Sequence, residues 1–217
     1  MFLLIVLAVG ITLAVSFLLS KTILRGVPSA FVLELPPYRR PKLGEVIVRS
    51  MLDRTIFVLA RAVTVAIPAG AVIWLCQNIM VNGHTLLYGM ATVLEPLGAC
   101  MGLSGVILMA FLLGIPANEI VIPILLMVYS QSGTLVEAEG IAQAGAILAA
   151  NGWTWVTAVC VILFSLNHFP CATTLLTIRK ETGSLLWTGL SFLLPTVVGV
   201  LLCIAVHLLA LLVGIFF

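Results

Sequence analysis

The chain has 217 residues, of which 62% are hydrophobic and 8% are charged, with a formal net charge of +2. Soluble domains carry about 25% charged residues, so this composition excludes an ordinary soluble domain, and so small a charge gives no basis for binding nucleic acid. The sequence contains no phosphate-binding loop, no dinucleotide fingerprint and no HExxH motif, so no motif in it indicates nucleotide chemistry or zinc-dependent hydrolysis.

The apolar residues occur in stretches long enough to cross a bilayer, for which a helix needs about 20 of them. We predict a transmembrane helix at residues 1–19, a cytoplasmic segment at 20–59 and a membrane domain at 60–217. The first helix lacks a basic start and a cleavage site, so we predict a retained helix rather than a signal peptide. The predicted fold class is all-α, a polytopic transmembrane helical bundle with broken or re-entrant helices.

The segment after the first helix is rich in proline. Four prolines lie between residues 28 and 41, and a proline restrains both its own φ and the residue before it, so we expect an extended strap at the membrane surface. From Lys42 the pattern is amphipathic, with Glu45, Arg49 and Asp53 on one polar stripe, which indicates an interfacial helix. A plain juxtamembrane linker is the alternative interpretation.

Positive charge predicts the orientation of the chain. Eight of the ten basic residues lie between Lys21 and Arg61, and short cytoplasmic loops collect Lys and Arg. The segment 20–59 is therefore predicted to be cytoplasmic, with the N-terminus outside. The next helix, at about 60–80, is then predicted to run outward to an external turn at 82–84.

The stretch 104–130 has two interpretations. It is long enough for one spanning helix, but the string GIPANE at 114–119 lies in its middle, and Pro116 cannot donate a hydrogen bond to the carbonyl of Leu112. The other interpretation is two half-helices that form a re-entrant hairpin. Topology favours the hairpin, because it places the basic pair at 179–180 in the cytoplasm.

Further breaks divide the rest of the membrane domain. The Gly-rich run at 95–102 is either a tight turn beside a path or an external loop that returns to the bilayer. Asn151-Gly152 interrupts the chain before a helix at 153–169, which ends at the Pro170-Cys171 break. A last apolar stretch at 185–216 is predicted to span once, with a kink at its internal proline.

Glu119 is the first candidate functional residue. A carboxylate between two long apolar runs is costly in a membrane unless it is paired or faces water. Its default interpretation is therefore functional: ion coordination, a proton relay or a gating contact. The alternative is a neutral, hydrogen-bonded Glu that caps the half-helix after Pro116.

The second candidate is the break around Pro170. There the sequence places His168 and Cys171 close together, with two threonines after them, and Pro170 frees the carbonyl of Leu166. Cys and His are ligands for a borderline transition-metal ion, although a buried Cys more often packs as a small hydrophobe. Because nothing indicates an oxyanion site beside Cys171, we predict that the chain is not an enzyme.

Three motifs, in this order, resemble those of FeoB-type ferrous iron transporters. The most specific is ELPPYR at 34–39, within a segment that resembles the strap of that family. GIPANE at 114–119, which follows Pro-Leu-Gly at 96–98, resembles the central membrane motif, usually Gly-x-x-Ala-Lys-Glu. PCATT at 170–174, through ETGS at 181–184, resembles the second Gate segment. The likeness extends over nearly the whole chain, which would be the C-terminal membrane half.

The resemblance implies a multi-pass protein of the bacterial inner membrane that transports Fe(II), with Fe(II) as the transported ion and no permanently bound cofactor. It implies that residues 60–217 form a membrane Gate-type domain. The residues that it places on the transport path are Pro116, Asn118, Glu119, Pro170 and Cys171. The candidate metal ligands are Cys171, Glu119 and His168.

Two departures from the family pattern bear on the mechanism. Asn118 stands where the family usually has a lysine, so Glu119 is either neutral or balanced by another cation, such as the transported one. The GTP-binding domain and the first Gate segment of the family do not occur in this sequence. We therefore expect a GTP-binding and first-Gate N-terminal half as partner, together with membrane lipid. No nucleic acid partner is expected, and a homo-oligomer is left open.

Two other functions remain in competition with iron transport. One is a Gate-type permease for nucleosides or other organic solutes, since Gate segments recur in that setting. Nucleoside recognition needs several convergent polar groups in a pocket, and polar residues are few in this chain. The other is a membrane assembly or regulatory subunit with no transport path, for which Glu119 and Cys171 would be dispensable.

Overall fold

The computed structural model describes residues 2–22, 44, 48, 52, 55–81, 83–130 and 140–214. It divides into two compact units, Met1–Arg49 and Ser50–Phe217. The predicted strap and interfacial helix lie almost entirely outside the described residues. The predicted domain boundaries at 19/20 and 59/60 stay predictions.

The first unit contains α1 (Phe2–Thr22), a helix of 21 residues. Its apolar side chains are exposed, as expected of a helix that faces lipid. The hydroxyl of Thr12 donates back to the carbonyl of Ala8 at 2.8 Å, so this polar group is satisfied within the helix. At the other end, the ammonium of Lys21 lies 4.5 Å from the centre of the Phe17 ring, a contact that suits a cation at a membrane boundary.

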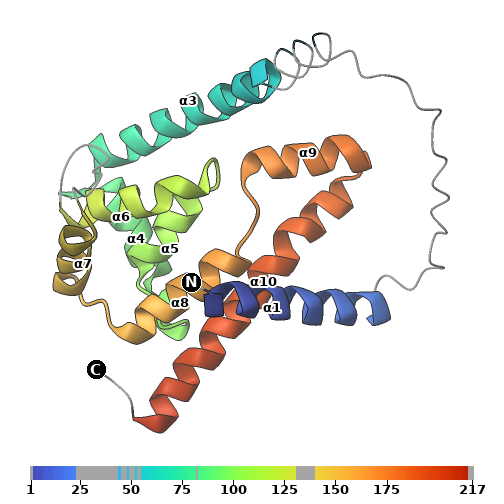
Figure 1. The fold of residues 1–217 in the computed structure, drawn as a ribbon. Coiled ribbons are helices and arrows are strands. Elements are labelled where there is room, and N and C mark those ends of the chain that lie inside the picture. The colour runs from blue at the N-terminus through green and yellow to red at the C-terminus, as the bar shows by residue number, and fades with distance from the viewer. Residues whose placement is uncertain are drawn as a thin grey trace. The chain divides into compact units, whose positions relative to one another are not determined.

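The second unit is almost entirely helical (Figure 1). Its elements are α3 (Phe57–Asn78), β1 (Met80–Val81), β2 (His84–Thr85), α4 (Leu86–Cys100), α5 (Gly105–Leu113), the short 3-10 helix η2 (Asn118–Ile120), α6 (Val121–Tyr129), α7 (Ile141–Ala150), α8 (Trp155–Asn167), α9 (Ala172–Thr182) and α10 (Leu185–Val213). The two short strands pair antiparallel, with Met80 opposite Thr85. The predicted all-α class is confirmed, with this small hairpin as an addition.

Glycine permits a close contact between α4 and α5. A Cβ on Gly105 would meet the carbonyl oxygen of Ala91 and would lie 2.7 Å from the amide nitrogen of Glu95. A Cβ on Gly98 would lie 2.9 Å from the carbonyl oxygen of Leu103. The two helices therefore pack backbone against backbone, which is the usual way for helices to approach closely in a membrane.

A second close helix contact lies between α8 and α10. A Cβ on Gly199 would lie 3.0 Å from the carbonyl oxygen of Asn167, so the small residue allows the approach. Cys160 and Cys203 are fully buried there, and the thiol of Cys203 lies 3.3 Å from the carbonyl oxygen of Cys160. Both cysteines serve as small packing residues whose thiols meet backbone carbonyls.

The predicted breaks are present. α5 ends at Leu113 and α6 begins at Val121, so GIPANE lies between two half-helices. The chain also breaks between α7 and α8 and between α8 and α9, whereas α10 continues as one helix through Pro195. The re-entrant course of 104–130 stays a prediction. The bend of 112° between α4 and α5 follows the Gly-rich run at 95–102, for which a tight turn was one of the two interpretations.

Three segments of the described chain are long and apolar enough to cross a membrane: Ile5–Thr22, Trp155–Thr182 and Leu185–Val213. The bent pair of α4 and α5 is a fourth candidate, either as a broken span or as a re-entrant loop. α3 has 22 residues, a length of about 33 Å, and its described apolar stretch is Ala62–Asn78. These helices define an integral membrane protein.

Candidate functional site

The two helix breaks that the sequence singled out meet in space. The amide N–H of Ala172, at the start of α9, donates to the carbonyl of Ile115 at 2.8 Å. Ile115 directly precedes Pro116, and Ala172 directly follows Cys171. This hydrogen bond therefore joins the break after α5 to the break after α8, and we call the place where they meet the junction.

Local sequence explains why α5 stops at the junction. Pro116 has no N–H for the helix ladder, and the chain instead makes turns in which the Ala117 N–H donates to the carbonyl of Gly114 at 3.0 Å. A Cβ on Gly114 would lie 2.5 Å from Cγ2 of Val121. Glycine there lets the first turn of α6 pack against the end of α5.

Cys171 lies at the junction as the residue before α9. Its sulfur is 3.1 Å from the hydroxyl oxygen of Thr173 and 3.1 Å from that of Thr174, and the side chain is half-buried. α9 starts without a side-chain cap from Cys171. The thiol and two hydroxyls thus form one small polar group at the break between α8 and α9, whereas the sequence analysis had grouped the His168 imidazole with them.

His168 has a different environment from Cys171. Its Nδ1 lies 2.9 Å from the carbonyl oxygen of Ser165, so Nδ1 carries the proton and Nε2 has the lone pair. The ring packs among aromatic side chains, with its centroid 5.2 Å from that of Phe111 and 5.1 Å from that of Phe169. Nε2 is buried without a hydrogen-bond partner among the described residues.

Asn118 and Glu119 lie in η2, between the half-helices. Both side chains are exposed. α6 begins after Ile120 without a side-chain cap, so the structure does not show the capping role that was the alternative interpretation of Glu119. An acidic residue just before the first turn of α6 is favoured by the partial positive charge of a helix N-terminus.

The candidate metal ligands do not converge in this structure. Within the described residues, no group of three or more His, Cys, Asp or Glu side chains could hold a metal ion. Cys171 faces the threonines of α9, His168 is surrounded by aromatic rings, and Glu119 lies in η2. Metal binding by each of these residues stays a prediction, and one shared three-ligand site is not present in this arrangement.

An apolar cavity of about 390 Å³ lies beside the junction. α3 contributes residues between Val65 and Ile73 to its walls, and the end of α5 contributes residues up to Pro116. All of the lining side chains are aliphatic or proline. The cavity gives the junction an apolar wall, and it offers no polar groups to recognise an organic solute.

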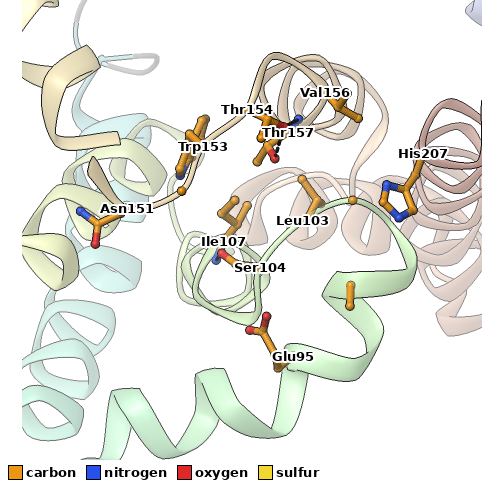
Figure 2. Close-up of a pocket in the computed structure, with 13 residues that line it drawn as sticks. Glu95, Leu103, Ser104, Ile107, Asn151, Trp153, Thr154, Val156, Thr157 and His207 are labelled. Carbon is orange, nitrogen blue, oxygen red and sulfur yellow. Dashed lines mark hydrogen bonds between the residues drawn. The ribbon is translucent and has the colours of Figure 1, made fainter. Parts of the chain in front are cut away.

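A second cavity, which we call the Glu95 cavity, has a volume of about 270 Å³ (Figure 2). The Glu95 carboxylate points toward the start of α5, where Oε2 accepts a hydrogen bond from the Gly105 N–H at 2.6 Å. Sequence reasoning missed this role. The signal was available, since Glu95 is another carboxylate in an apolar run, and the cost argument made for Glu119 applies to it equally.

Two helices begin at the Glu95 cavity. Ser104 caps α5 and Thr154 caps α8, each through its side-chain oxygen. Helix N-termini carry partial positive charge, so the carboxylate of Glu95 balances the charge that they bring to the cavity. Across the cavity, a Cβ on Gly102 would lie 2.8 Å from Nδ1 of His207, so the α4–α5 turn packs directly against α10.

Comparison with known proteins supports this architecture. Residues 1–54 match the family model described as "Ferrous iron transport protein B C terminus". Residues 59–185 match the Gate family, described as "Nucleoside recognition". No solved structure matches the chain.

Several curated relatives carry the name Fe(2+) transporter FeoB. One from Staphylococcus aureus (strain MSSA476) is 29% identical over 210 residues, which covers 91% of this chain and 29% of the relative. One from Methanocaldococcus jannaschii is 27% identical over 192 residues, or 81% of this chain and 27% of the relative. One from Synechocystis is 30% identical over 171 residues, or 77% of this chain and 26% of the relative.

Fold and junction together define a helical integral membrane protein whose apolar helices are broken at proline-containing strings. The chain belongs to the Gate family, whose model covers more than half of it. It corresponds to the C-terminal region of FeoB-type ferrous iron transporters, as its motifs indicated. The chain spans less than a third of the length of the relatives it matches.

Proposed function

We propose that this chain is the C-terminal permease portion of a ferrous iron transporter, and that it carries Fe(II) across the bacterial inner membrane. It acts together with a GTP-binding and first-Gate half that lies outside this sequence. GTP hydrolysis belongs to that other half, and this chain supplies part of the membrane path.

The observation that carries the proposal is the junction. Interrupted helices place backbone carbonyls and side-chain ligands inside a membrane domain, and such interruptions are tolerated where protein or a water-filled path covers them. Here one hydrogen bond brings the Ile115-Pro116 break to the thiol-bearing break at Cys171. The names of the relatives, Fe(2+) transporter FeoB, support Fe(II) as the ion.

In this mechanism Cys171 and Glu119 contact the ion in succession rather than as one fixed site. Because the described residues hold no group of three ligands, the ion keeps part of its hydration shell and binds weakly, as conduction requires. Asn118 leaves Glu119 without the neighbouring lysine of the family pattern. The passing cation then supplies the charge that balances this carboxylate.

The test is Fe(II) uptake in bacterial cells that lack their own iron transporters. The chain is expressed alone, with a separate GTP-binding and first-Gate chain, and as Cys171→Ser or Glu119→Gln with that partner. We expect uptake in the paired state. We expect each substitution to lower uptake by about tenfold or more, which corresponds to roughly 1.4 kcal/mol of lost interaction.

Cys100→Ser is the matched control, because Cys100 is an exposed cysteine on α4, away from the junction. It should retain full uptake and full membrane insertion. Normal uptake by both Cys171→Ser and Glu119→Gln would contradict the assigned path. Their dispensability, combined with stable binding of the partner chain, would instead identify an assembly or regulatory subunit.

The family description "Nucleoside recognition" makes a nucleoside permease the second candidate. The cavity beside the junction has an aliphatic lining, which argues against a polar solute there. The two functions are separated by thermal unfolding of the purified chain with each ligand. Stabilisation by nucleosides and not by Fe(II) would favour the second candidate.

A further inference from the structure

A larger cavity lies beside the β1–β2 hairpin, and we call it the hairpin cavity. Its volume is about 700 Å³, and its walls come from the end of α3, the hairpin, the starts of α4 and α5, the end of α6 and the turn after α7. Its lining includes Asn78, Met80, His84, Tyr129 and Asn151. Among the described residues that line it there is no Asp, Glu, Lys or Arg.

More helices end than begin at the hairpin cavity, so the partial charges of the helix termini there are negative in sum. α3 ends at Asn78 and α6 ends at Tyr129, and Asn151 is the residue that follows the end of α7. The last turn of a helix carries partial negative charge from carbonyls that lack partners in the ladder. α4 begins at the same cavity, with its first turn capped by Thr85. α5 also begins there, with Val106 of its first turn in the lining and Ser104 as its cap, so three helix ends lie against two capped helix starts, a balance that favours a cation.

The two asparagines are oriented to present oxygen. The amide nitrogen of Asn78 donates to the carbonyl of Trp74 at 2.8 Å, and that of Asn151 donates to the carbonyl of Ile147 at 2.8 Å. Each nitrogen is thereby engaged by its own helix. The amide oxygens are left as the groups that can accept a ligand, and amide oxygens are ligands for hard and borderline cations.

The β1–β2 hairpin adds two potential metal ligands, an imidazole and a thioether, that are softer than amide oxygens. The His84 ring stacks on Tyr88 with centroids 4.9 Å apart, and the imidazole is exposed. Met80 is 73% exposed, so its thioether is accessible. Imidazole and thioether suit transition-metal ions better than Mg²⁺ or Ca²⁺. The ligand class that fits the whole lining is a partly hydrated divalent transition-metal ion.

The cavity lies at the predicted external end of α3. The basic cluster that ends at Arg61 precedes or begins this helix, and it predicts that this end is cytoplasmic. The opposite end, at Asn78, then opens outside. Along the same helix, Ile73 lines the apolar cavity beside the junction, about one turn from Gln77, which lines the hairpin cavity.

We propose that the hairpin cavity is the external entrance site, in which His84 and the amide oxygens of Asn78 and Asn151 capture a partly hydrated divalent cation before it moves to the junction. The direction of movement rests on the proposed function; binding in the cavity does not. A neutral lining binds a cation weakly enough to release it onward, as a conducting path requires.

Binding is measured by calorimetry on the purified full chain in lipid nanodiscs, with Co(II) as an air-stable probe and with Fe(II) under anaerobic conditions. His84→Ala and Asn78→Leu should each weaken binding by about tenfold, or roughly 1.4 kcal/mol. Asn78→Asp should tighten binding, because it adds a negative charge at the same place. Thermal unfolding of each variant checks that it is folded.

His207→Gln is the matched control, since it removes an imidazole from the other polar cavity. It should change the affinity by less than about twofold, as expected for a site without shared ligands. Unchanged binding in Asn78→Leu would overturn the site, because it would reduce the binding to a lone surface histidine. An equal loss in His207→Gln would overturn it as well.

Sidedness is tested by Met80→Cys in a Cys100→Ser background, labelled on intact cells with a membrane-impermeant maleimide. We expect labelling from outside and protection by Co(II). Labelling that appears only after permeabilisation would overturn the external assignment.

In uptake assays, His84→Ala should raise KM and leave the maximal rate unchanged. Absence of uptake in every variant would instead refute the proposed function, while calorimetry and labelling would still decide the entrance site.

Discussion

The Glu95 cavity and the hairpin cavity are neighbours that differ in the charge of their lining. The first receives the N-termini of α5 and α8, the end of α4 and the turn after α7, and it contains its own carboxylate. The second receives the ends of α3, α6 and α7 and the starts of α4 and α5, and it has no charged lining residue among those described. Asn151 lines both. The carboxylate of the first cavity and the neutral lining of the second thus distinguish two adjacent polar cavities in one membrane domain.

The wall between the two cavities is hydrogen-bonded. The indole N–H of Trp153 donates to the hydroxyl oxygen of Tyr129 at 3.1 Å, and that oxygen lies 3.5 Å from the side-chain oxygen of Ser104. The Glu95 side already contains a carboxylate that balances its helix N-termini, whereas the hairpin side has amide oxygens available as acceptors. Polar lining alone does not identify a ligand site; the charge balance of the lining must also be counted.

The largest expected effect comes from a substitution that forces α4 and α5 apart beside the Glu95 cavity. Gly105→Ala would place a Cβ against the Ala91 carbonyl and 2.7 Å from the Glu95 nitrogen, so α4 and α5 must separate. We expect a loss of about 3 kcal/mol in unfolding free energy, measured by denaturant titration in detergent. Gly89→Ala, in the neighbouring helix α4 with open space around it, should be neutral or stabilising. Equal stability of the two variants would refute the close contact.

A smaller loss is expected from removing the internal carboxylate. Glu95→Ala leaves the Gly105 N–H without its acceptor and the two N-termini without a balancing charge, so it should cost about 2 kcal/mol. Glu95→Gln keeps an acceptor oxygen and should cost about half as much. Thermal unfolding of both variants separates the contribution of the hydrogen bond to Gly105 from that of the negative charge of Glu95. An identical loss in both would show that the charge, rather than the hydrogen bond, stabilises this turn.

The smallest effect should come from removing the hydrogen bond between Trp153 and Tyr129 in the wall between the two cavities. Tyr129→Phe removes the acceptor of the Trp153 N–H and should lower the unfolding free energy by about 1 kcal/mol. It should also make the Trp153 fluorescence more sensitive to aqueous quenchers, because water from either cavity would solvate the indole. The measurement is acrylamide quenching relative to the unsubstituted chain. Unchanged quenching would indicate that the hydroxyl does not separate the cavities.

The helix breaks could be predicted from the sequence because their causes are local. Pro116 and Pro170 lack the N–H that a helix ladder needs, and Asn151-Gly152 gives the chain a glycine at φ 79°, a conformation that glycine adopts readily. The packing of Cys160 and Cys203 likewise agrees with their apolar surroundings in the sequence. These features depend on each residue and its immediate neighbours.

The site geometry could not be predicted in the same way. His168 and Cys171 are three residues apart, yet the first turns into an aromatic cluster and the second faces the threonines of α9. The sharp bend between α4 and α5 depends on a contact between Glu95 and Gly105, ten residues apart. No periodicity or propensity specifies such a pairing, because it forms only when both helices are in place.

By itself, the sequence determined that this is a membrane-embedded helical protein, where its helices break, and which family motifs it contains. It did so because hydropathy and proline chemistry act through neighbouring residues. Only the tertiary structure decided that the breaks at Ile115 and Ala172 share a hydrogen bond, and that the start of α5 lies against the Glu95 carboxylate while three helices end at the hairpin cavity. Those outcomes depend on the directions in which whole helices run, which are set by packing between distant segments.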